Sequence, residues 1–402
     1  MQKAGRECLG PYMICPRWEI LGVVADHWRQ PFHIYKQPGR CATVEEFICP
    51  VRIFSGPGSL GALETFGARR LFVVTDTALF KSGAAKAAAA RARCREAAYF
   101  PVDPKPTVET AAQGAGKLRA FHPDLVAAIG TGDTLDCAKA MAYFSKVDCP
   151  LAAVPGLPGA GSEVTPFSTL LHEGAARTIR QDGLRPAAAI LDGDLLREQS
   201  GQAMAQGGFL VLSHALEAYV ARGGGTLSGI FAREAFSAAY GALPAACAGK
   251  DRARGRLLEA SAMAGAAYAQ AGLGMCQAIM ESLGRFFPLS PGILTAILLP
   301  SVLSINAQVV GGQYGCLARS AGMGGSTQST ALGNLRNALG RLRRELELPE
   351  TLAQAGVDPR AVWSHTGAIV SAAMDSPHSQ KNPLEPEDFL IRRVLEEVTG
   401  RV

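Results

Sequence analysis

The sequence predicts an α/β half built on a parallel sheet, followed by an all-helical half. Between residues 51 and 192, short apolar runs typical of strands alternate with segments of helical spacing. The apolar run Leu125–Ile129 leads through the turn Gly130–Asp133 into a helix, the arrangement with which α/β proteins bind phosphate. After Ser200 only helical periodicity remains. Such an order is typical of a sheet covered by helices on both faces, with ligands at the carboxyl ends of its strands.

Length and composition set the broad class. The chain has 402 residues, of which 48% are hydrophobic and 19% charged, enough for two domains with sizeable cores. We expect domains at 49–200 and 201–402, after an atypical segment at 1–48. The net charge of +5 is spread without a basic cluster, so nucleic acid is not an expected partner. The sequence has no apolar run long enough to span a membrane, and its ten cysteines form no CxxC pair. These two observations predict a cytoplasmic protein without a membrane partner.

The first 48 residues lack any sustained period of 2 or 3.6. Their Cys and His residues match no standard zinc-finger spacing, so a zinc knuckle is not expected there. A flexible tail, a segment that docks on a partner, and an upstream start with Met13 as the rival start all remain open. This segment is left out of the fold prediction.

The α/β half is predicted element by element from Val51. Ser59 is placed to cap a helix that follows the first strand, and Thr107 to cap the helix 108–121. Residues 169–176 read as a hairpin with His172 at its exposed tip, and we do not expect His172 to be catalytic. The predicted strands are 51–56, Arg70–Asp76, 97–102, Leu125–Ile129, 150–155 and 187–192, and a further helix covers 78–93.

The helical half is predicted from periodicity interrupted by Gly or Pro. The expected helices are 208–222, 227–247, 252–271, 273–287, 292–306, 328–345, 359–374 and 386–399. A cleft at the seam between the halves, near 192–206, is the default ligand site.

Two glycine-rich turns at neighbouring strand ends predict a nucleotide cleft. The first is Gly130-Thr131-Gly132-Asp133, and the second contains Gly159, Gly161 and Ser162. Asp76 ends another strand, where an acid binds a ribose diol or else serves as a turn or helix-capping residue. Taken alone, either glycine turn is also explained as a plain connection that needs glycine for its geometry.

Taken together, the motifs resemble those of the iron-dependent (group III) alcohol dehydrogenases, near the propanol dehydrogenases of bacterial microcompartments. The resemblance covers about residues 50–400. It rests on Ser55-Gly-Pro-Gly-Ser-Leu60, Val74-Thr-Asp76, Pro104-Lys-Pro-Thr107, Gly130-x-Gly-x-x-x-Asp136-x-x-Lys139, Gly159-x-Gly-Ser-Glu163, Ile190-Leu-Asp192, His214-Ala-Leu-Glu-Ala-Tyr219 and Ala271-Gly-Leu-Gly274. It implies a Rossmann-like domain with NAD(P) on the glycine turns, a helical domain, and often a homodimer. Asp136 then counts among the cofactor-binding residues, and a cytoplasmic or microcompartment-associated location is implied.

The family's metal ligands do not carry over to this chain. The resemblance implies one Asp and three His holding Fe²⁺ or Zn²⁺, at positions that here are Leu210, His214, Gln277 and Pro291. Leu and Pro have no donor atom and Gln is a weak ligand, so we expect no Fe or Zn. A makeshift site of His214, Glu281 and Glu217 is set aside, because Glu217 lies one turn further along its helix.

The cofactor site also departs from the family. Asp133 stands where the family has Ser and puts a carboxylate at the mouth of the phosphate site. Like charges ~5 Å apart at an effective dielectric of ~20 repel by about 3 kcal/mol, so NAD binding is expected to be weakened. Asp133 would also serve well as a helix N-cap. The second turn, from Gly156 to Gly161, lacks three hydroxyls of the family pattern, while Asp76 favours NAD over NADP.

Two main functions follow from these features, beside a third in which the protein is a binding module that keeps the cleft for a different small ligand. The first is an NAD-linked oxidoreductase of a small alcohol or aldehyde that works without metal, with His214 or Glu281 as proton donor. The second is a catalytically inactive relative that acts as a scaffold, regulatory partner or microcompartment component. Family resemblance favours the first, and the lost ligands, the acidic turn and the missing hydroxyls favour the second.

Overall fold

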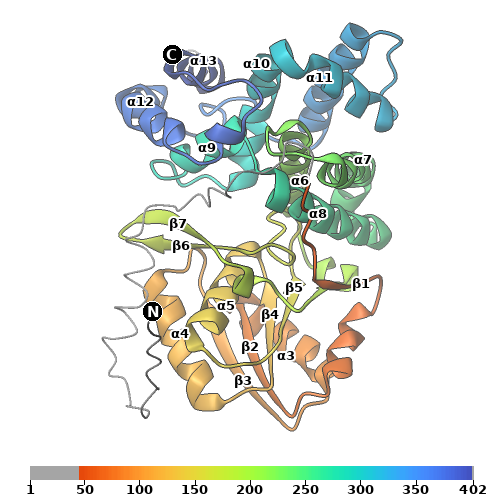
Figure 1. The fold of residues 1–402 in the computed structure, drawn as a ribbon, viewed down its shortest axis with the longest axis vertical. Helices are drawn as coiled ribbons and strands as arrows, with labels where there is room; N and C mark the ends of the chain where they lie inside the picture. The colour runs from red at the N-terminus through yellow and green to blue at the C-terminus, as the bar shows by residue number, and fades with distance from the viewer. Residues whose placement is uncertain (1–44, 401–402) are drawn as a thin grey trace, which may run out of the picture.

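The computed structural model describes residues 45–400 and shows an α/β half joined to a helical half. In Figure 1 the sheet lies below the helical half, and the β6–β7 hairpin lies at the level between them. The sheet is parallel throughout, in the order β1-β8-β5-β4-β2-β3. This confirms the predicted fold class. Residues 1–44, with most of the atypical segment and every Cys and His considered for a zinc knuckle, lie outside the described part.

The strands of the α/β half fall close to their predicted places. They are β1 (Arg52–Ser55), β2 (Arg70–Asp76), β3 (Glu96–Val102), β4 (Leu125–Gly130), β5 (Leu151–Pro155) and β8 (Ala188–Leu191), with the hairpin β6 (Phe167–His172) and β7 (Ala175–Arg180). The helices are η1 (Ser59–Phe66), α2 (Thr77–Lys81), α3 (Ala84–Ala89), η2 (Ala90–Ala92), α4 (Val108–Phe121), α5 (Gly132–Ser145), η3 (Asp182–Leu184) and η4 (Gly193–Leu196). The single helix predicted over 78–93 is wrong, because Gly83 adopts a left-handed conformation and divides it.

Alternation along the central strands places a core on each face of the sheet. Phe72 and Val74 of β2 pack with α4 and α5, whereas Leu71 and Val73 pack with η1 and α3. In strand β4, Val126 likewise packs on the side of α4 and α5, and Ala127 on the side of η1 and α3. Both faces are therefore covered, as a parallel sheet requires.

The helical half contains eight α-helices within the described residues. They are α6 (Gly201–Val220), α7 (Thr226–Cys247), α8 (Asp251–Ala271), α9 (Met275–Leu283), α10 (Pro291–Ser320), α11 (Gln328–Glu345), α12 (Pro359–Met374) and α13 (Asp388–Thr399), with a short turn η5 (Ser379–Lys381). The predicted end of the helix at 306 is too early, since α10 continues to Ser320 through a kink at Val310.

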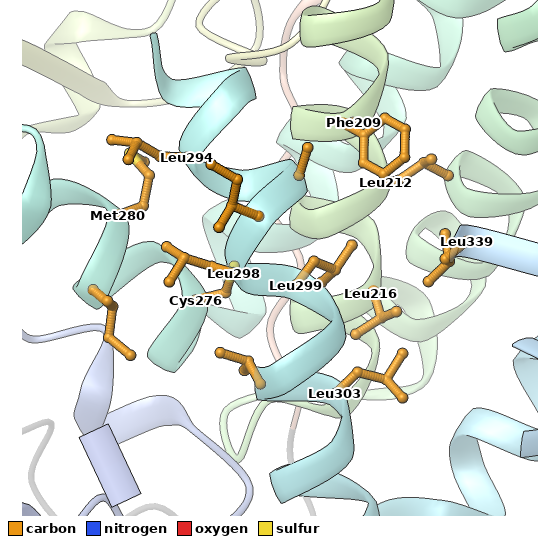
Figure 2. Close-up of a cluster of buried hydrophobic side chains, with 14 of the residues drawn as sticks. Phe209, Leu212, Leu216, Cys276, Met280, Leu294, Leu298, Leu299, Leu303 and Leu339 are labelled. Atoms are coloured by element: carbon orange, nitrogen blue, oxygen red, sulfur yellow. The ribbon is translucent and has the colours of Figure 1, made fainter. Parts of the chain in front are cut away.

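Helix α10 forms the centre of this half. Figure 2 shows its leucines, including Leu294, Leu298 and Leu303, packed between α6 and α9. By length and composition α10 is the one described helix that would be able to span a membrane, but 56% of that stretch is buried inside the protein. A helix apolar on all sides is expected at the centre of a large core.

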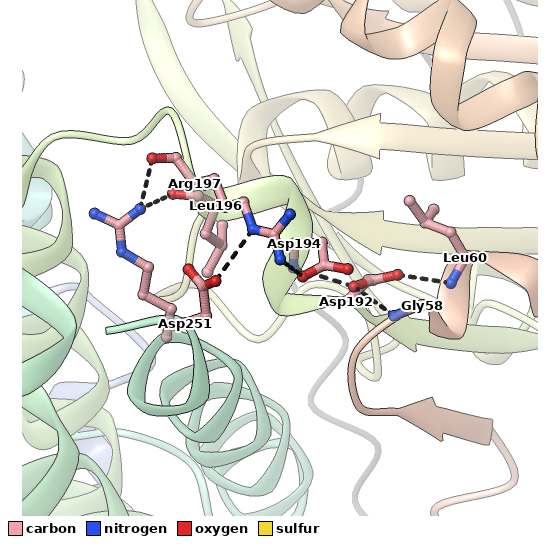
Figure 3. Close-up of polar contacts among 8 residues, drawn as sticks. Gly58, Leu60, Asp192, Asp194, Leu196, Arg197 and Asp251 are labelled. Carbon is pink, nitrogen blue, oxygen red and sulfur yellow. Dashed lines mark hydrogen bonds and ion pairs between the residues drawn. The ribbon is translucent and has the colours of Figure 1, made fainter. Parts of the chain in front are cut away.

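Asp192 joins the sheet to the segment that follows β1. Its carboxylate accepts hydrogen bonds from the backbone amides of Gly58 (3.2 Å), Leu60 (2.9 Å) and Asp194 (3.1 Å), as Figure 3 shows. The predicted capping role of Ser59 is wrong, because its side chain makes no cap bond and Asp192 serves these amides instead. The cap thus comes from a residue more than a hundred positions away, which local sequence does not reveal.

Replacing Asp192 with Ala is expected to lower the free energy of unfolding by about 2–4 kcal/mol, since its amide partners would lose a charged acceptor that is only 1% exposed. Urea unfolding would measure this. The control is Asp194→Asn, which breaks a partly exposed pair with Arg197 (2.8 Å) and is expected to cost less than about 1 kcal/mol. Equal losses in the two variants would show that the Asp192 cap contributes little.

The chain enters the described fold against the helical half. The Glu45 carboxylate accepts a hydrogen bond from the Thr226 amide (2.8 Å), and the Phe47 ring stacks on Phe231 at a centroid distance of 5.1 Å. Residues 45–48 are therefore packed on the protein, although they belong to the segment set apart in the sequence. The predicted domain limits at 48/49 and 200/201 remain predictions.

Candidate functional site

The two glycine turns lie side by side at the carboxyl ends of β4 and β5. Gly130 is paired with Pro155, and the Gly156 amide donates to the Gly130 carbonyl at 2.7 Å. A Cβ on Gly132 would lie 2.7 Å from the Cβ of Ala160, so glycine is needed where the turns touch. Helix α5 starts at Gly132, which places its free amides and positive dipole end at this junction. The backbone therefore has the form of a phosphate site.

Asp76 lies against the first turn. Its carboxylate accepts hydrogen bonds from the amide (3.0 Å) and hydroxyl (3.2 Å) of Thr131, and also from the Thr134 hydroxyl. It makes no cap bond to the helix that follows β2, which removes the capping alternative. Burial raises the pKa of Asp76, and the three hydrogen bonds oppose this change. Contact with a ribose remains a prediction.

Asp133 is exposed on the first turn of α5. The expected N-cap role is wrong, because the N-cap position belongs to Thr131 and the Asp133 carboxylate accepts from the Lys105 amide at 3.0 Å. Lys105 has a left-handed backbone (φ 57°) that aims its amide toward the turn. The negative charge nevertheless stays at the helix N-terminus, where a phosphate would bind.

Asp136, on the same helix, points into the protein. Its carboxylate contacts the Lys139 ammonium at 2.8 Å and accepts from the Thr169 amide at 2.9 Å, which ties α5 to the hairpin. Lys139 is fully buried and also donates to the Ser162 carbonyl at 3.0 Å. Next to this group, burial raises the pKa of Glu163 to about 7. These charges hold the second turn in place, and a direct role of Asp136 or Ser162 in cofactor binding stays a prediction.

The second turn is pressed against the helical half. Gly161 has a left-handed backbone (φ 66°), and a Cβ there would lie 2.6 Å from the Cα of Gly265 in α8. The Gly159 amide donates to the Ser261 hydroxyl at 3.0 Å, and the Tyr268 hydroxyl donates to the Ala160 carbonyl at 2.6 Å. The glycines of this turn are therefore explained by close packing as well as by any ligand.

The four positions at which the family resemblance places metal ligands fall in this region. Leu210 and His214 lie one turn apart on α6, and the side chain of Leu210 packs beside Gly159. Gln277 lies on α9, and Pro291 is the exposed first residue of α10. Among these four side chains only His214 carries a strong donor, and its Nε2 already faces Gln277 Oε1 at 3.2 Å. The chemistry of this set does not fit Fe²⁺ or Zn²⁺.

His214 is held on three sides. Its Nδ1 lies 3.1 Å from the Gly159 carbonyl, and its ring contacts Tyr268 at a centroid distance of 5.1 Å. The side chain is 4% exposed, and burial lowers its pKa to about 4, so the imidazole is neutral at pH 7. The contact with Tyr268 was not foreseen, because this residue lies in a helix whose pattern reads only as core.

Glu281 extends the chain of contacts from His214 toward the surface. Gln277 Nε2 lies 2.8 Å from Glu281 Oε1, and the same oxygen lies 3.6 Å from His378 Nε2. The side chains of Glu281 and His378 are 33% and 27% exposed. His378 was missed in the sequence, since it lies in the loop before η5, far from the other residues and outside any periodic pattern.

Glu217 has a structural role. Its carboxylate accepts hydrogen bonds from the Cys276 amide (2.7 Å) and the Gln277 amide (3.3 Å), which begin α9. Burial raises the pKa of Glu217 to about 7.

Across the described residues, no group of three or more His, Cys, Asp and Glu side chains is arranged to hold a metal ion.

Comparison with known proteins gives consistent relatives. The iron-containing alcohol dehydrogenase family matches residues 50–193, and the C-terminal domain of the same family matches residues 204–399. The 1-propanol dehydrogenase PduQ of Salmonella typhimurium is 32% identical over 367 residues, which cover 88% of this chain and 99% of PduQ. The NADPH-dependent butanol dehydrogenase of Clostridium saccharobutylicum is 26% identical over 379 residues, covering 87% and 97%.

Solved structures share the fold over the same region. An iron-containing alcohol dehydrogenase from Thermococcus thioreducens superposes with a TM-score of 0.80 at 27% identity, covering 88% of this chain and 99% of that one. A sulfoacetaldehyde reductase from Bifidobacterium kashiwanohense, solved with NAD⁺, superposes with a TM-score of 0.80 at 22% identity, covering 89% and 99%. The matches span both halves of the chain. It belongs to the iron-containing alcohol dehydrogenase family.

Proposed function

We propose that this protein is an NAD-linked oxidoreductase of a small alcohol or aldehyde that works without the iron or zinc of its family. The observation that carries the proposal is the set of side chains at the four ligand positions. Leu210 and Pro291 have no atom able to bind a metal, and the Gln277 side chain is hydrogen-bonded to His214. The two adjoining glycine turns at the start of α5 support a cofactor site there. The relatives named as alcohol dehydrogenases support the substrate class.

The residues of the first turn would bind and orient the cofactor, which when bound supplies or accepts a hydride. The first amides of α5 would receive a phosphate, and Asp76 would disfavour a 2′-phosphate through its charge. The carboxylate of Asp133 opposes the phosphate, so we expect binding to be weak and to depend on salt.

Of the two candidate proton donors, accessibility favours Glu281. His214 is 4% exposed, and both of its ring nitrogens contact protein atoms. Glu281 is one-third exposed and lies one helical turn after Gln277, on the surface side of the contact chain. His214 then acts as a positioning residue.

Titration of NADH fluorescence, together with metal analysis of the purified protein, tests the proposal. We expect NADH to bind and less than about one-tenth of the chains to carry Fe or Zn, because a metal site needs about three strong ligands. Alcohol oxidation should then be insensitive to chelators. One equivalent of bound metal with chelator-sensitive activity would contradict a metal-free reaction.

A non-catalytic role is the second candidate. It is favoured by Asp133 and by the second turn, where Gly156, Leu157 and Pro158 provide no hydroxyl donors. In that case the protein would serve as a scaffold, regulatory partner or microcompartment component. No NADH binding at either low or high salt would favour this function. A homodimer in the cytoplasm, associated with a microcompartment, is proposed for either function from the family resemblance.

A further inference from the structure

The hydrogen bonds around Gln277 require one more hydrogen than a neutral His214, the Gln277 amide and an ionised Glu281 can donate. Three consecutive contacts join Gly159 O to His214 Nδ1 (3.1 Å), His214 Nε2 to Gln277 (3.2 Å), and Gln277 to Glu281 Oε1 (2.8 Å). Each contact needs one donated hydrogen. A neutral imidazole donates once, and a side-chain amide donates at only one of its two ends. An ionised Glu281 donates none, so one of the three contacts is left with two acceptors facing each other, whichever way the Gln277 amide is turned.

A hydrogen on Glu281 completes the chain. With the Gln277 amide turned over relative to the contacts above, so that its oxygen faces Glu281, the carboxyl would donate to that oxygen, the Gln277 amide to His214 Nε2, and His214 Nδ1 to the Gly159 carbonyl. The alternative, a second hydrogen on His214, requires a buried imidazolium in direct contact with no carboxylate, which burial disfavours. The arrangement therefore selects Glu281 as the site of the hydrogen.

We infer that Glu281 and His378 share one proton at neutral pH, that this proton lies on Glu281, and that it is the proton delivered to substrate. His378 is then a positioning residue that exchanges the proton with solvent. The pair is suited to this role because Glu281 Oε1 lies 3.6 Å from His378 Nε2 and both side chains are partly exposed. This inference rests on the proposed oxidoreductase function.

The groups facing Glu281 are consistent with one retained proton. His378 lies on one side, Gln277 and Arg285 belong to its own segment, and His214 lies on α6, while Glu217 of α6 acts on His378. Although burial opposes charge on His378, the neighbouring Glu281 raises the pKa of His378, so the pair as a whole keeps a proton at pH 7. Burial opposes charge on Glu281 too, but the contact with His378 lowers the pKa of Glu281, which taken alone would leave the proton on the imidazole. The hydrogen count along the Gln277 contacts decides for Glu281 instead.

The reaction step balances with these groups. In carbonyl reduction, a hydride from the reduced nicotinamide forms the new C–H bond, and the C=O double bond becomes a single bond. The proton leaves Glu281 Oε1 for the carbonyl oxygen, which leaves a carboxylate. His378 then returns a proton taken from water to Glu281.

The test compares the pH dependence of the melting temperature in wild type, Glu281→Gln and His378→Gln. In Glu281→Gln the introduced amide carries a permanent hydrogen in place of the carboxyl hydrogen. At pH 6 we expect Glu281→Gln to melt within about 2–4 °C of wild type, the shift that a small change in stability produces in a domain of this size. From pH 6 to 9 wild type should lose stability relative to Glu281→Gln, because a proton bound only in the folded state is lost as pH rises. Titration of Glu163 is common to all three proteins and cancels, whereas Glu217 interacts with His378 and is left unchanged only between wild type and Glu281→Gln.

His378→Gln distinguishes this arrangement from an ordinary ion pair. If the proton lies on Glu281, His378→Gln keeps the loss of stability with rising pH. If His378 carries the proton, the loss disappears in both variants, and this result would overturn the inference. A second measurement is nitrogen NMR of ¹⁵N-histidine-labelled, metal-free protein at pH 7. A neutral His378 supports the inference, and an imidazolium overturns it. Both readouts are independent of NADH binding and activity, so the proposed function can fail separately.

Discussion

The triple variant Leu210→Asp, Gln277→His, Pro291→His is expected to bind Fe²⁺ or Zn²⁺ at least roughly a thousandfold more tightly than wild type. Loss of a residue that only hydrogen-bonds to a metal ligand already costs about 10–100-fold in metal affinity, and here three ligands are supplied together. The side chain of residue 210 lies one turn before His214 on α6, so both face the same region, and residue 277 already contacts His214. Metal content after dialysis, measured by elemental analysis, checks the result.

Adding His214→Ala to the triple variant provides the matched control. It removes the one side chain among the four positions that is a strong metal donor in the natural chain, and we expect metal content to return toward the wild-type value. Pro291 starts α10 as its first residue, a position that tolerates other residues, so folding should survive its replacement. A folded triple variant with no added metal would show that these positions do not converge on one site.

Asp133→Asn is expected to tighten NADH binding by up to roughly a hundredfold at low salt. The estimate follows from about 3 kcal/mol of repulsion between two charges ~5 Å apart at an effective dielectric of ~20. Asn keeps an oxygen able to accept from the Lys105 amide, so the local hydrogen bond at 3.0 Å is retained. Fluorescence titration at two ionic strengths measures the effect, which should shrink as salt screens the charge.

Asp148→Asn is the control for net charge. Asp148 is exposed before the amino end of β5, whereas the glycine turns follow the carboxyl ends of β4 and β5, so its replacement should leave the NADH affinity unchanged. Equal tightening in both variants would assign the effect to overall charge. No tightening in Asp133→Asn would mean that its carboxylate is not near the phosphate.

Local patterns predicted most of the fold. Strand β2 runs from Arg70 to Asp76 and helix α4 from 108 to 121 in both the sequence prediction and the structure. Thr107 caps α4 through a bond from the Thr110 amide at 3.2 Å, as its position indicated. These features succeed because residues within one turn of each other determine them.

Long-range partners explain where local patterns failed. Ser59 and Asp133 have the right residue types for caps, but Asp192 and Lys105, distant in sequence, contribute the decisive bonds. In the candidate site, motif positions led to His214, Gln277 and Glu281. The partner of Glu281 did not follow from any motif, since His378 is brought to it by the packing of α12 on α9.

The close approach of Gly161 and Gly265 has a practical consequence for dissecting the protein. A Cβ at either glycine would lie within 2.8 Å of a backbone atom of the other, so the second glycine turn takes its shape from contact with α8. A fragment ending near residue 200 would leave that loop without its support. The region of the two glycine turns is therefore not a transplantable module, and a fragment that keeps its shape must include both glycines.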